Sequence, residues 1–387
     1  MCEWKNVTIG EIIYNIGGTP LEKYVSDKES YKFISIGNYS VDGKYIDNGN
    51  RIELNEKTKE KKLNKNDLVM ILNDKTTSGD LIGSTILIDA DEEYIYNQRS
   101  ERIICKDCVT PQFLWYVLNS KYFRNKVFKI AQGGTQIYIN FKDIKQIKIK
   151  IPTIEQQNYI CNKLSIIQNV IEMGKQQISL VENFKQQLIN KIFDKNIMGI
   201  NTVGKIRDVV SFSGGSQPEK KFFVKESKEN YIRLIQIRDF KSDDYLTYIP
   251  QTMARKTCEK DDVMIGRYGP PVFQILRGLE GAYNVALIKC IPEKNYSKDY
   301  IYYMLLEEKL HRKIEWLSQR SSGQTGVDME FLNNYPTIIP NQQQQAAIVN
   351  MLKLIDKKIE ILTQKYKNYI KIKEELIEKL IVSKIRE

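Results

Sequence analysis

Few residues of this sequence stand in patterns that support catalysis. The single histidine, His311, lies in the charged segment 308–313, where we expect a solvated surface residue. Ser-His-Asp and Cys-His mechanisms both need a histidine beside the nucleophile, so this placement argues against them. Cys105 and Cys108 form a C-x-x-C pair, but the sequence has no second such pair and no histidine pair to complete a zinc site. The pair also ends a predicted strand rather than opening a helix, which argues against a redox motif.

Phosphate-binding glycine motifs are absent as well. The sequence contains no G-x-x-x-x-G-K-[ST] motif, and its Gly-Gly pairs do not form G-x-G-x-x-G between a strand and a helix. Carboxylates are plentiful, but no spacing selects a catalytic set among them. We therefore expect no metal, nucleotide or AdoMet site in this chain, and a binding protein rather than an enzyme.

Polar loops in both halves of the chain carry side chains that read nucleic acids. Arginine can bind guanine through two hydrogen bonds, and glutamine or asparagine can bind adenine in the same way. The net charge of +11 and the pI of about 9.0 favour a polyanionic partner, although a lysine-rich protein without such a partner has the same composition. The candidate DNA-binding residues are Lys75, Thr76, Thr77, Asn97, Gln98, Arg99, Gln136, Arg267, Tyr268, Gln274, Arg277, Arg320 and Gln324.

Taken singly, each of these residues is better explained as a solvated surface group. The interpretation depends on two loops that carry such residues at corresponding places in the two halves. The lysine-rich stretches 57–65 and 220–221 would contact phosphates, which position a protein on DNA without specifying sequence.

A long internal repeat organises the chain and must position these loops. The stretch from Ile151 to Phe193 recurs from Ile339 without a gap, at the constant offset of 188 that aligns Pro152 with Pro340. The segments before the two copies share an order of strand and helix signals, but their middles, 44–99 and 241–284, do not match. The chain therefore has the order A-B-A′-B′. We expect segments at 1–152, 153–198, 199–340 and 341–387.

The A segments mix strands and helices. In the first, short β-rich runs at 32–36, 67–71 and 84–88 predict strands, and 111–118 predicts a helix that begins at a proline. A last strand is expected over 144–151. A duplicated scaffold with divergent loops indicates two similar modules that recognise different things.

The B segments predict long helices with defined starts. Thr153-x-x-Gln156 and Asn341-x-x-Gln344 are capping boxes, each directly after a proline. Apolar residues then recur in steps of four and three, which is typical of a coiled coil, whereas a helix on a globular core would show a wider stripe. Lys185 and Lys373 interrupt the seams at equivalent positions and are expected to fix the register. Seam residues assigned to helix pairing and partner docking are Ile160, Leu164, Ile167, Ile171, Leu188, Ile348, Leu352, Ile355, Ile359 and Leu376.

These features predict an α+β chain: two similar mixed α/β domains separated by two long helices that form an antiparallel coiled coil. The sequence has no apolar run long enough to cross a bilayer and begins without an apolar signal segment. Its six cysteines have no framework spacing and are expected to be reduced thiols, which favours a cytoplasmic location.

The whole pattern resembles the specificity (S) subunit of type I DNA restriction-modification systems. The similarity lies in the A-B-A′-B′ order, the Gly-Gly near the start of each module, the helix lead-ins IPTIEQQ and IPNQQQQ, and the Leu-Ile-x-Lys-Ile helix end. One departure concerns the segment before the lead-ins, where Gly134-Thr135-Gln136 is matched by Ser322-Gly323-Gln324. It leaves Gln136 and Gln324 as the shared element.

The resemblance implies a role and a set of partners. Each A segment would be a target-recognition domain that reads one half of a bipartite double-stranded DNA site. The helices would space the half-sites and dock two methyltransferase (M) subunits, which restriction (R) subunits join. AdoMet, ATP and Mg would then belong to the partner subunits, and no cofactor to this chain.

Two other readings fit parts of the sequence. A coiled-coil adaptor with two peptide-binding modules would have the same repeat, but the basic balance and amide-rich loops count against it. A remnant of a fused methyltransferase-nuclease is disfavoured by the missing cofactor motifs.

Overall fold

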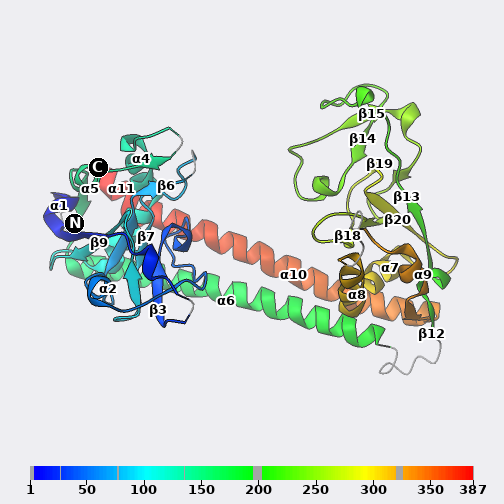
Figure 1. Ribbon diagram of the computed structural model, residues 1–387, viewed down its shortest axis with the longest axis horizontal. Coiled ribbons are helices and arrows are strands. Elements are labelled where there is room, and N and C mark those ends of the chain that lie inside the picture. Colours follow the sequence, from blue (N-terminus) through cyan, green and yellow to red (C-terminus); the bar gives the residue numbers. More distant parts are fainter. Residues whose placement is uncertain are drawn as a thin grey trace. The chain divides into compact units, whose positions relative to one another are not determined.

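The computed structural model describes residues 4–26, 28–75, 78–134, 136–194, 203–319 and 326–386. The chain forms two compact units, which are Met1–Met173 with Lys365–Glu387, and Gly174–Gln364 (Figure 1). Each unit therefore contains one module and half of each long helix. The boundary between the units crosses both long helices, so each module packs as one body with the helical segments of its own unit.

The first module is built on a four-stranded antiparallel sheet in the order β2-β9-β5-β7. Beside it lies the sheet β4-β3-β8, and β1 pairs with β11 and β6 with β10. The strands are β1 Lys5–Thr8, β2 Ile13–Gly17, β3 Tyr31–Ile34, β4 Arg51–Ile52, β5 Leu68–Ile71, β6 Asn73–Asp74, β7 Thr85–Leu87, β8 Tyr94–Tyr96, β9 Ser100–Cys105, β10 Ile137–Tyr138 and β11 Lys148–Ile151. The short helices are α1 Ile9–Ile12, α2 Glu56–Lys59, α3 Pro111–Asn119, α4 Lys121–Ile130 and α5 Phe141–Lys145.

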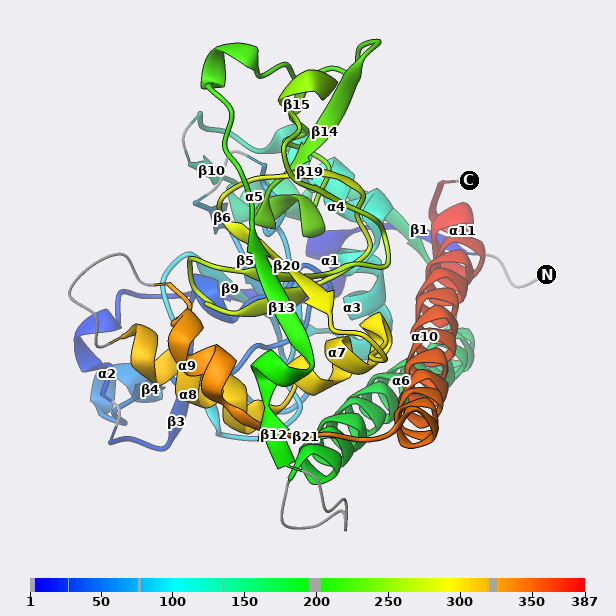
Figure 2. The same cartoon turned by 90° about the vertical axis from the view of Figure 1, so that its right-hand side faces the viewer.

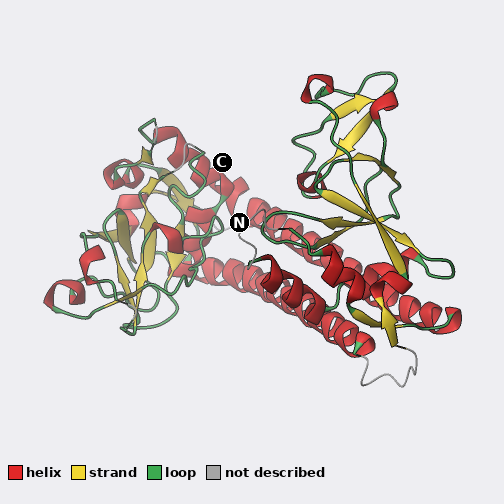
Figure 3. Ribbon diagram, turned by 45° about the vertical axis from the view of Figure 1, so that its right-hand side comes forward, coloured by secondary structure: helices red, strands yellow, loops and turns green. Residues whose placement is uncertain are grey.

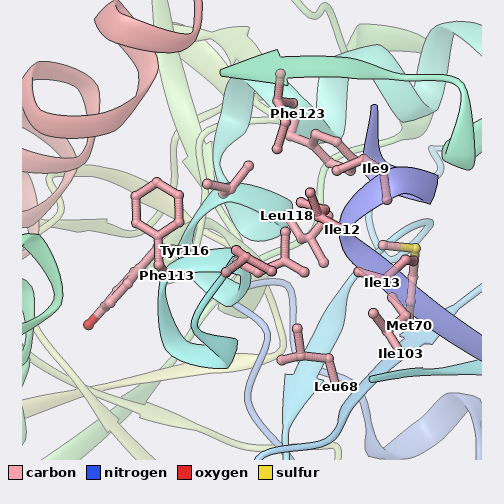
Figure 4. Packing of buried hydrophobic residues seen from close by; sticks show 14 of the residues in the cluster. Ile9, Ile12, Ile13, Leu68, Met70, Ile103, Phe113, Tyr116, Leu118 and Phe123 are labelled. Atoms are coloured by element: carbon pink, nitrogen blue, oxygen red, sulfur yellow. The ribbon is translucent and has the colours of Figure 1, made fainter. Parts of the chain in front are cut away.

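The core of the first unit forms where α3 and α4 cover the sheet. Phe113 and Leu118 of α3 and Phe123 of α4 are fully buried among strand residues such as Met70 and Ile103 (Figure 4). Thr110 caps α3, because its Oγ1 accepts a hydrogen bond from Phe113 N at 3.3 Å. The helix thus begins where its proline predicts.

The second module repeats this frame. Its sheets have the orders β13-β20-β17-β18 and β15-β14-β19-β16, and β12 pairs with β21 (Figures 2 and 3). The strands are β12 Val203–Lys205, β13 Val210–Gly214, β14 Tyr231–Ile235, β15 Tyr248–Pro250, β16 Thr257–Cys258, β17 Val263–Gly266, β18 Gln274–Leu276, β19 Gly281–Tyr283, β20 Leu287–Pro292 and β21 Pro336–Ile338. The helices are α7 Lys298–Leu305, α8 Glu308–Ser318 and α9 Met329–Asn334.

The structure confirms most of the predicted elements and corrects one. The runs at 32–36, 67–71 and 84–88 correspond to β3, β5 and β7. The strand expected from Ile144 is wrong at its start, because residues 141–145 form α5 and the strand begins only at Lys148. Phe141 and Ile144 are both buried at a spacing of three, which one face of a helix satisfies and a strand does not.

Two long helices complete the units. Helix α6 runs over Ile154–Phe193 and α10 over Gln342–Ile377, followed by a π-helical turn, Glu378–Val382, and α11 Ser383–Arg386. The second capping box is complete: Gln344 N donates to Asn341 Oδ1 at 2.9 Å, and Asn341 N donates to Gln344 Oε1 at 3.0 Å. In the first box, Gln156 N lies 3.5 Å from Thr153 Oγ1 and Gln156 Oε1 has no partner among the described residues.

The helical segments run antiparallel within each unit. In the first unit, Lys373 Nζ donates to Gln168 Oε1 at 2.7 Å, while α11 contacts β11 just before α6. In the second unit, Lys185 forms an ion pair with Asp356. Gln168 and Asp356 occupy equivalent positions of the repeat, and so do Lys185 and Lys373. In both units, therefore, the lysine that interrupts the seam of one helix contacts the same repeat position on the other helix.

The seam residues are buried by the chain itself. Ile160, Leu164, Ile171, Ile348 and Leu352 are buried, and the other seam residues assigned above are partly buried. Their assignment to helix pairing agrees with this burial. Their assignment to partner docking is not supported for the five buried side chains, which are enclosed by the chain itself, and for the partly buried ones it stays a prediction.

Replacing Leu164 by aspartate should destabilise the chain by about 3 kcal/mol or more, because a carboxylate would be buried without a partner. Ile166→Asp is the matched control, since Ile166 lies two residues away on the exposed face of the same helix. Thermal unfolding should show a much lower Tm for L164D than for I166D. Equal Tm values would contradict the seam assignment.

Candidate nucleic-acid interface

A fixed loop follows β17 in the second module. Arg267 N donates to Ala286 O at 2.8 Å, and Val327 N donates to Arg267 O at 3.1 Å, so the backbone is held from both sides. Tyr268 pairs with Gly326, and the Arg267 guanidinium lies 5.3 Å from the Tyr268 ring centroid. Both side chains are half-exposed on a rigid backbone, as a base-reading site requires.

The base of this loop packs on His311, which the sequence analysis expected to be a solvated surface residue. Phe273 is buried, and its ring centroid lies 4.9 Å from that of His311. His311 is therefore not a solvated surface residue: it is partly buried, its Nε2 lies 2.8 Å from Leu305 O, and burial lowers its pKa. The ring packs beneath the loop and has a structural role.

Two candidates of the second module are engaged within the protein. Arg277 forms an ion pair with Asp299 at 2.7 Å and lies over the Tyr302 ring, so its guanidinium is committed to the fold. Gln274 Nε2 donates to Pro271 O at 3.0 Å and supports the loop. Arg320 and Gln324 lie outside the described residues.

The corresponding loop of the first module follows β5. There β6 pairs with β10, with Asp74 opposite Ile137 and Asn73 opposite Tyr138. The antiparallel register places Lys75 across from Gln136, and both residues are exposed. Thr76 and Thr77 lie outside the part of the chain that the structure describes.

Arg99 joins this loop from a neighbouring turn. Leu72 N donates to Arg99 O at 2.8 Å, in the same way that Arg267 N donates to Ala286 O in the second module. Arg99 has φ of +66° and an exposed side chain, which makes no hydrogen bond or ion pair among the described residues. Its guanidinium is therefore available to a ligand.

The two residues before Arg99 have a different role. Asn97 is buried: its Oδ1 accepts from Leu21 N at 3.1 Å and its Nδ2 donates to Glu22 Oε1 at 2.8 Å. Gln98 Nε2 donates to the same Glu22 oxygen at 3.0 Å. The expectation that Asn97 reads DNA is wrong, because both the oxygen and the nitrogen of its side-chain amide are already hydrogen-bonded within the protein. These residues hold the turn that presents Arg99.

Sequence reasoning missed one exposed aromatic residue. The side chain of Tyr138 is half-exposed beside Gln136 at the strand that pairs with the loop. Its place two residues after Gln136 of the Gly-Thr-Gln segment was the available signal. We call Lys75, Arg99, Gln136 and Tyr138 of the first module, and Arg267 and Tyr268 of the second, the reading edges of the two modules. The loops correspond, but the named residues do not match one to one, because the shared hydrogen bonds align Arg267 with Leu72 and Arg99 with Ala286. Each lies where β5 or β17 ends.

One acidic group has the composition of a cation site. Glu259, Asp261 and Asp262 place carboxylate oxygens close together, and this is the one such group among the described residues. Lys298 Nζ lies 2.7–3.3 Å from all three side chains. The lysine already supplies the positive charge, so the group is an ion-pair cluster. No described helix has the length and apolar character needed to cross a membrane.

Comparisons with known proteins identify relatives of the whole chain. Residues 1–183 and 200–371 each match the family model of the type I restriction modification DNA specificity domain. The MjaVIII specificity subunit of Methanocaldococcus jannaschii is 34% identical over 136 residues, which cover 35% of this chain and 32% of that protein. The putative MjaX specificity subunit of the same organism is 24% identical over 352 residues, or 82% of this chain and 78% of that protein.

Solved structures show the same fold at low identity. An S subunit of a type I restriction-modification system from M. genitalium superposes with a TM-score of 0.55 at 16% identity, covering 98% of this chain and 96% of that one. A chain from a study of type I R-M complex assembly and conformational transition gives 0.66 at 15% identity, covering 98% of both chains.

Arg99→Ala and Arg267→Ala should each reduce discrimination between the preferred duplex and random duplex by roughly 1–3 kcal/mol, the worth of one base-edge contact. The preferred sequence would be recovered by selection from a randomised duplex library, and affinities measured by fluorescence anisotropy. Arg277→Ala is the control, since its guanidinium is paired with Asp299. An equal loss of affinity for the preferred and the random duplex would indicate a phosphate contact instead.

Proposed function

Because the chain belongs to the type I restriction-modification specificity family, whose role is DNA recognition rather than catalysis, we propose that each module reads one half of a bipartite DNA site. The observation that carries this proposal is the pair of reading edges. They occupy equivalent places on one duplicated frame, yet present Lys75, Arg99 and Gln136 in one module and Arg267 and Tyr268 in the other. The same scaffold with different side chains would read two different sequences.

We further propose that partner subunits dock on an exposed apolar face of the helices. On the long helices, three large apolar side chains in each unit are 43–70% exposed and recur at equivalent positions of the repeat, whereas others, such as Leu180 at 67%, have no large apolar counterpart. In the first unit they are Ile166, Met173 and Ile372, and in the second they are Leu354, Ile361 and Phe184. The offset of 188 relates the members one to one, so the docking patches are two copies of one surface.

The heptad explains why these residues form a patch. With Leu164 and Ile171 at a positions, Ile166 and Met173 fall at c, and Ile372 falls at g because it precedes the seam residue Lys373. At 3.6 residues per turn, c and g lie about 40° apart on a helix. In an antiparallel pair the g positions of both helices lie on the same side. Because Lys373 meets Gln168, Ile372 lies across from the stretch between Ile166 and Met173.

The modules pack on the opposite side of the helices. Glu172 and Gln186 both occupy b positions; Glu172 forms an ion pair with Lys44, and Gln186 Nε2 donates to Leu306 O at 3.0 Å. The c and g side is therefore left uncovered by the chain's own modules. An uncovered apolar face at heptad spacing is typical of a helix-docking surface.

Duplication of the patch indicates two copies of one partner. Under this proposal the partners are two methyltransferase (M) subunits, joined by restriction (R) subunits, and the lengths of the helices set the spacing of the half-sites. AdoMet, ATP and Mg would be bound by those subunits, and the complex would act in the cytoplasm. The solved relative whose title concerns complex assembly of a type I R-M system supports this view.

Duplex DNA should bind this chain with strong salt dependence, because each phosphate neutralised by a cation releases counterions. Raising the salt from about 50 to 200 mM should weaken binding by at least tenfold. The assay is anisotropy of a labelled duplex, with an acidic peptide as the control ligand. Salt-insensitive binding, or preference for the peptide, would favour the adaptor reading.

Docking on two equivalent patches predicts a stepwise loss of stoichiometry. Met173→Asp and Ile361→Asp should each remove one M subunit, and the double variant both, because a charge would be buried in each interface. Gln176→Asp is the control, an exposed polar residue on the same helix. Native mass spectrometry with the cognate M subunit counts the copies. Two bound M subunits in the double variant would exclude these patches.

A further inference from the structure

The second module contains a pocket of about 400 Å³ beside its reading edge, which we call the Arg207 pocket. Arg207 and Arg267 line it together with Ser211, Phe212, Ile288 and Asn333. Arg267 belongs to both the pocket and the reading edge. The pocket is therefore continuous with the surface that faces a bound duplex under the function proposed above.

The chemistry of the pocket suits an anion. Two guanidinium groups line it, and its described lining includes no carboxylate. Arg207 Nη1 donates to Asn334 Oδ1 at 3.2 Å, which orients the guanidinium. Arg207 Nε also forms a long ion pair of 4.0 Å with Asp208 Oδ1, while the other oxygen of that carboxylate accepts from Lys205 N at 2.7 Å. Arginine forks bind phosphate oxygens through paired hydrogen bonds.

The first module has the opposite character at the same place. The strand pairings align Phe212 with Asn15 and Ile288 with Glu101, and the helix before the repeat aligns Asn333 with Lys145. There Asn15 Nδ2 donates to Glu101 Oε1 at 2.6 Å, and Lys145 Nζ donates to Asn15 Oδ1 at 3.3 Å. The place is filled by a hydrogen-bonded network with a buried carboxylate.

Glycine at the position of Arg207 completes the contrast. The counterpart of Arg207 is Gly10, and a Cβ there would lie 3.2 Å from the Cβ of Lys145. A side chain at this position of the first module would therefore crowd Lys145. The same arrangement of strands thus holds a filled, carboxylate-containing site in the first module and an open, cationic pocket in the second. The pocket is therefore not a necessary consequence of the fold.

We propose that the Arg207 pocket binds a phosphate group of the DNA backbone next to the half-site read by the second module. Arg207 positions the duplex without reading a base, and Arg267 links this phosphate to the base edge. The inference rests on the proposed function. It adds an asymmetry, because the cation at this place in the first module, Lys145, is part of the network with Asn15 and Glu101, and that module would hold its half-site by other contacts.

The test compares wild-type chain, Arg207→Ala and Arg207→Lys on a labelled 20-bp duplex of random sequence over a range of NaCl concentrations. R207A should weaken binding roughly tenfold at low salt, as expected for a charged hydrogen bond, and lower the slope of log K against log salt by about 0.9, the value for one phosphate. R207K should keep the slope. Arg312→Ala is the control, an exposed arginine of α8 paired with Glu308 within its own helix.

Each outcome distinguishes the pocket from the wider function. A wild-type chain that fails to bind any duplex would overturn the proposed function itself. Wild-type binding with unchanged affinity and slope in R207A would overturn the pocket alone, as would a loss confined to one selected sequence, which indicates a base contact. Inorganic phosphate should compete no better than chloride at equal ionic strength. Selective competition that R207A abolishes would identify a free phosphoanion and overturn the DNA assignment.

Discussion

The helix contact between a seam lysine and its polar partner is the constraint on which both units depend. A heptad seam of leucine and isoleucine can slide by whole heptads at little energetic cost, whereas a lysine in the seam needs an oxygen at one position. Lys373 meets Gln168 and Lys185 meets Asp356, at the same register in both units. Burial lowers the pKa of Lys373, and the contact with Gln168 offsets part of the cost of burying the ammonium. The register then decides which face of the helices is exposed and which face holds the module.

The modules show how one frame supports two specificities. Equivalent sheets, β2-β9-β5-β7 and β13-β20-β17-β18, end in loops that are held by the same backbone hydrogen bonds, from Leu72 to Arg99 and from Arg267 to Ala286. Because the backbone is fixed by main-chain contacts, the side chains at these positions can change without loss of the fold. The exposed side chains of Lys75 and Gln136 and the partly buried side chain of Tyr268 can therefore differ between relatives while the sheet beneath remains constant.

The sequence predicted the architecture because its signals are periodic. The offset repeat, the heptads and the capping residues depend only on spacing, and Leu164, Leu352 and Asn341 lie where spacing places them. Single site residues were harder, because their roles depend on partners distant in the chain. Asn97 binds Glu22, Arg277 binds Asp299 and His311 packs on Phe273. No pattern of neighbouring residues in the sequence predicts these contacts. The docking face was missed for a related reason, since exposure at c and g depends on which side of the helix the module covers.

The central claim is that each module independently reads one half-site. Its most direct measurement maps methylated adenines in genomic DNA from cells that carry this chain with its M subunit, before and after residues 1–152 are exchanged for the module of a relative. The account predicts a bipartite methylated motif in which one half changes while the other half and the spacing stay the same. A change in both halves, or in neither, would contradict it.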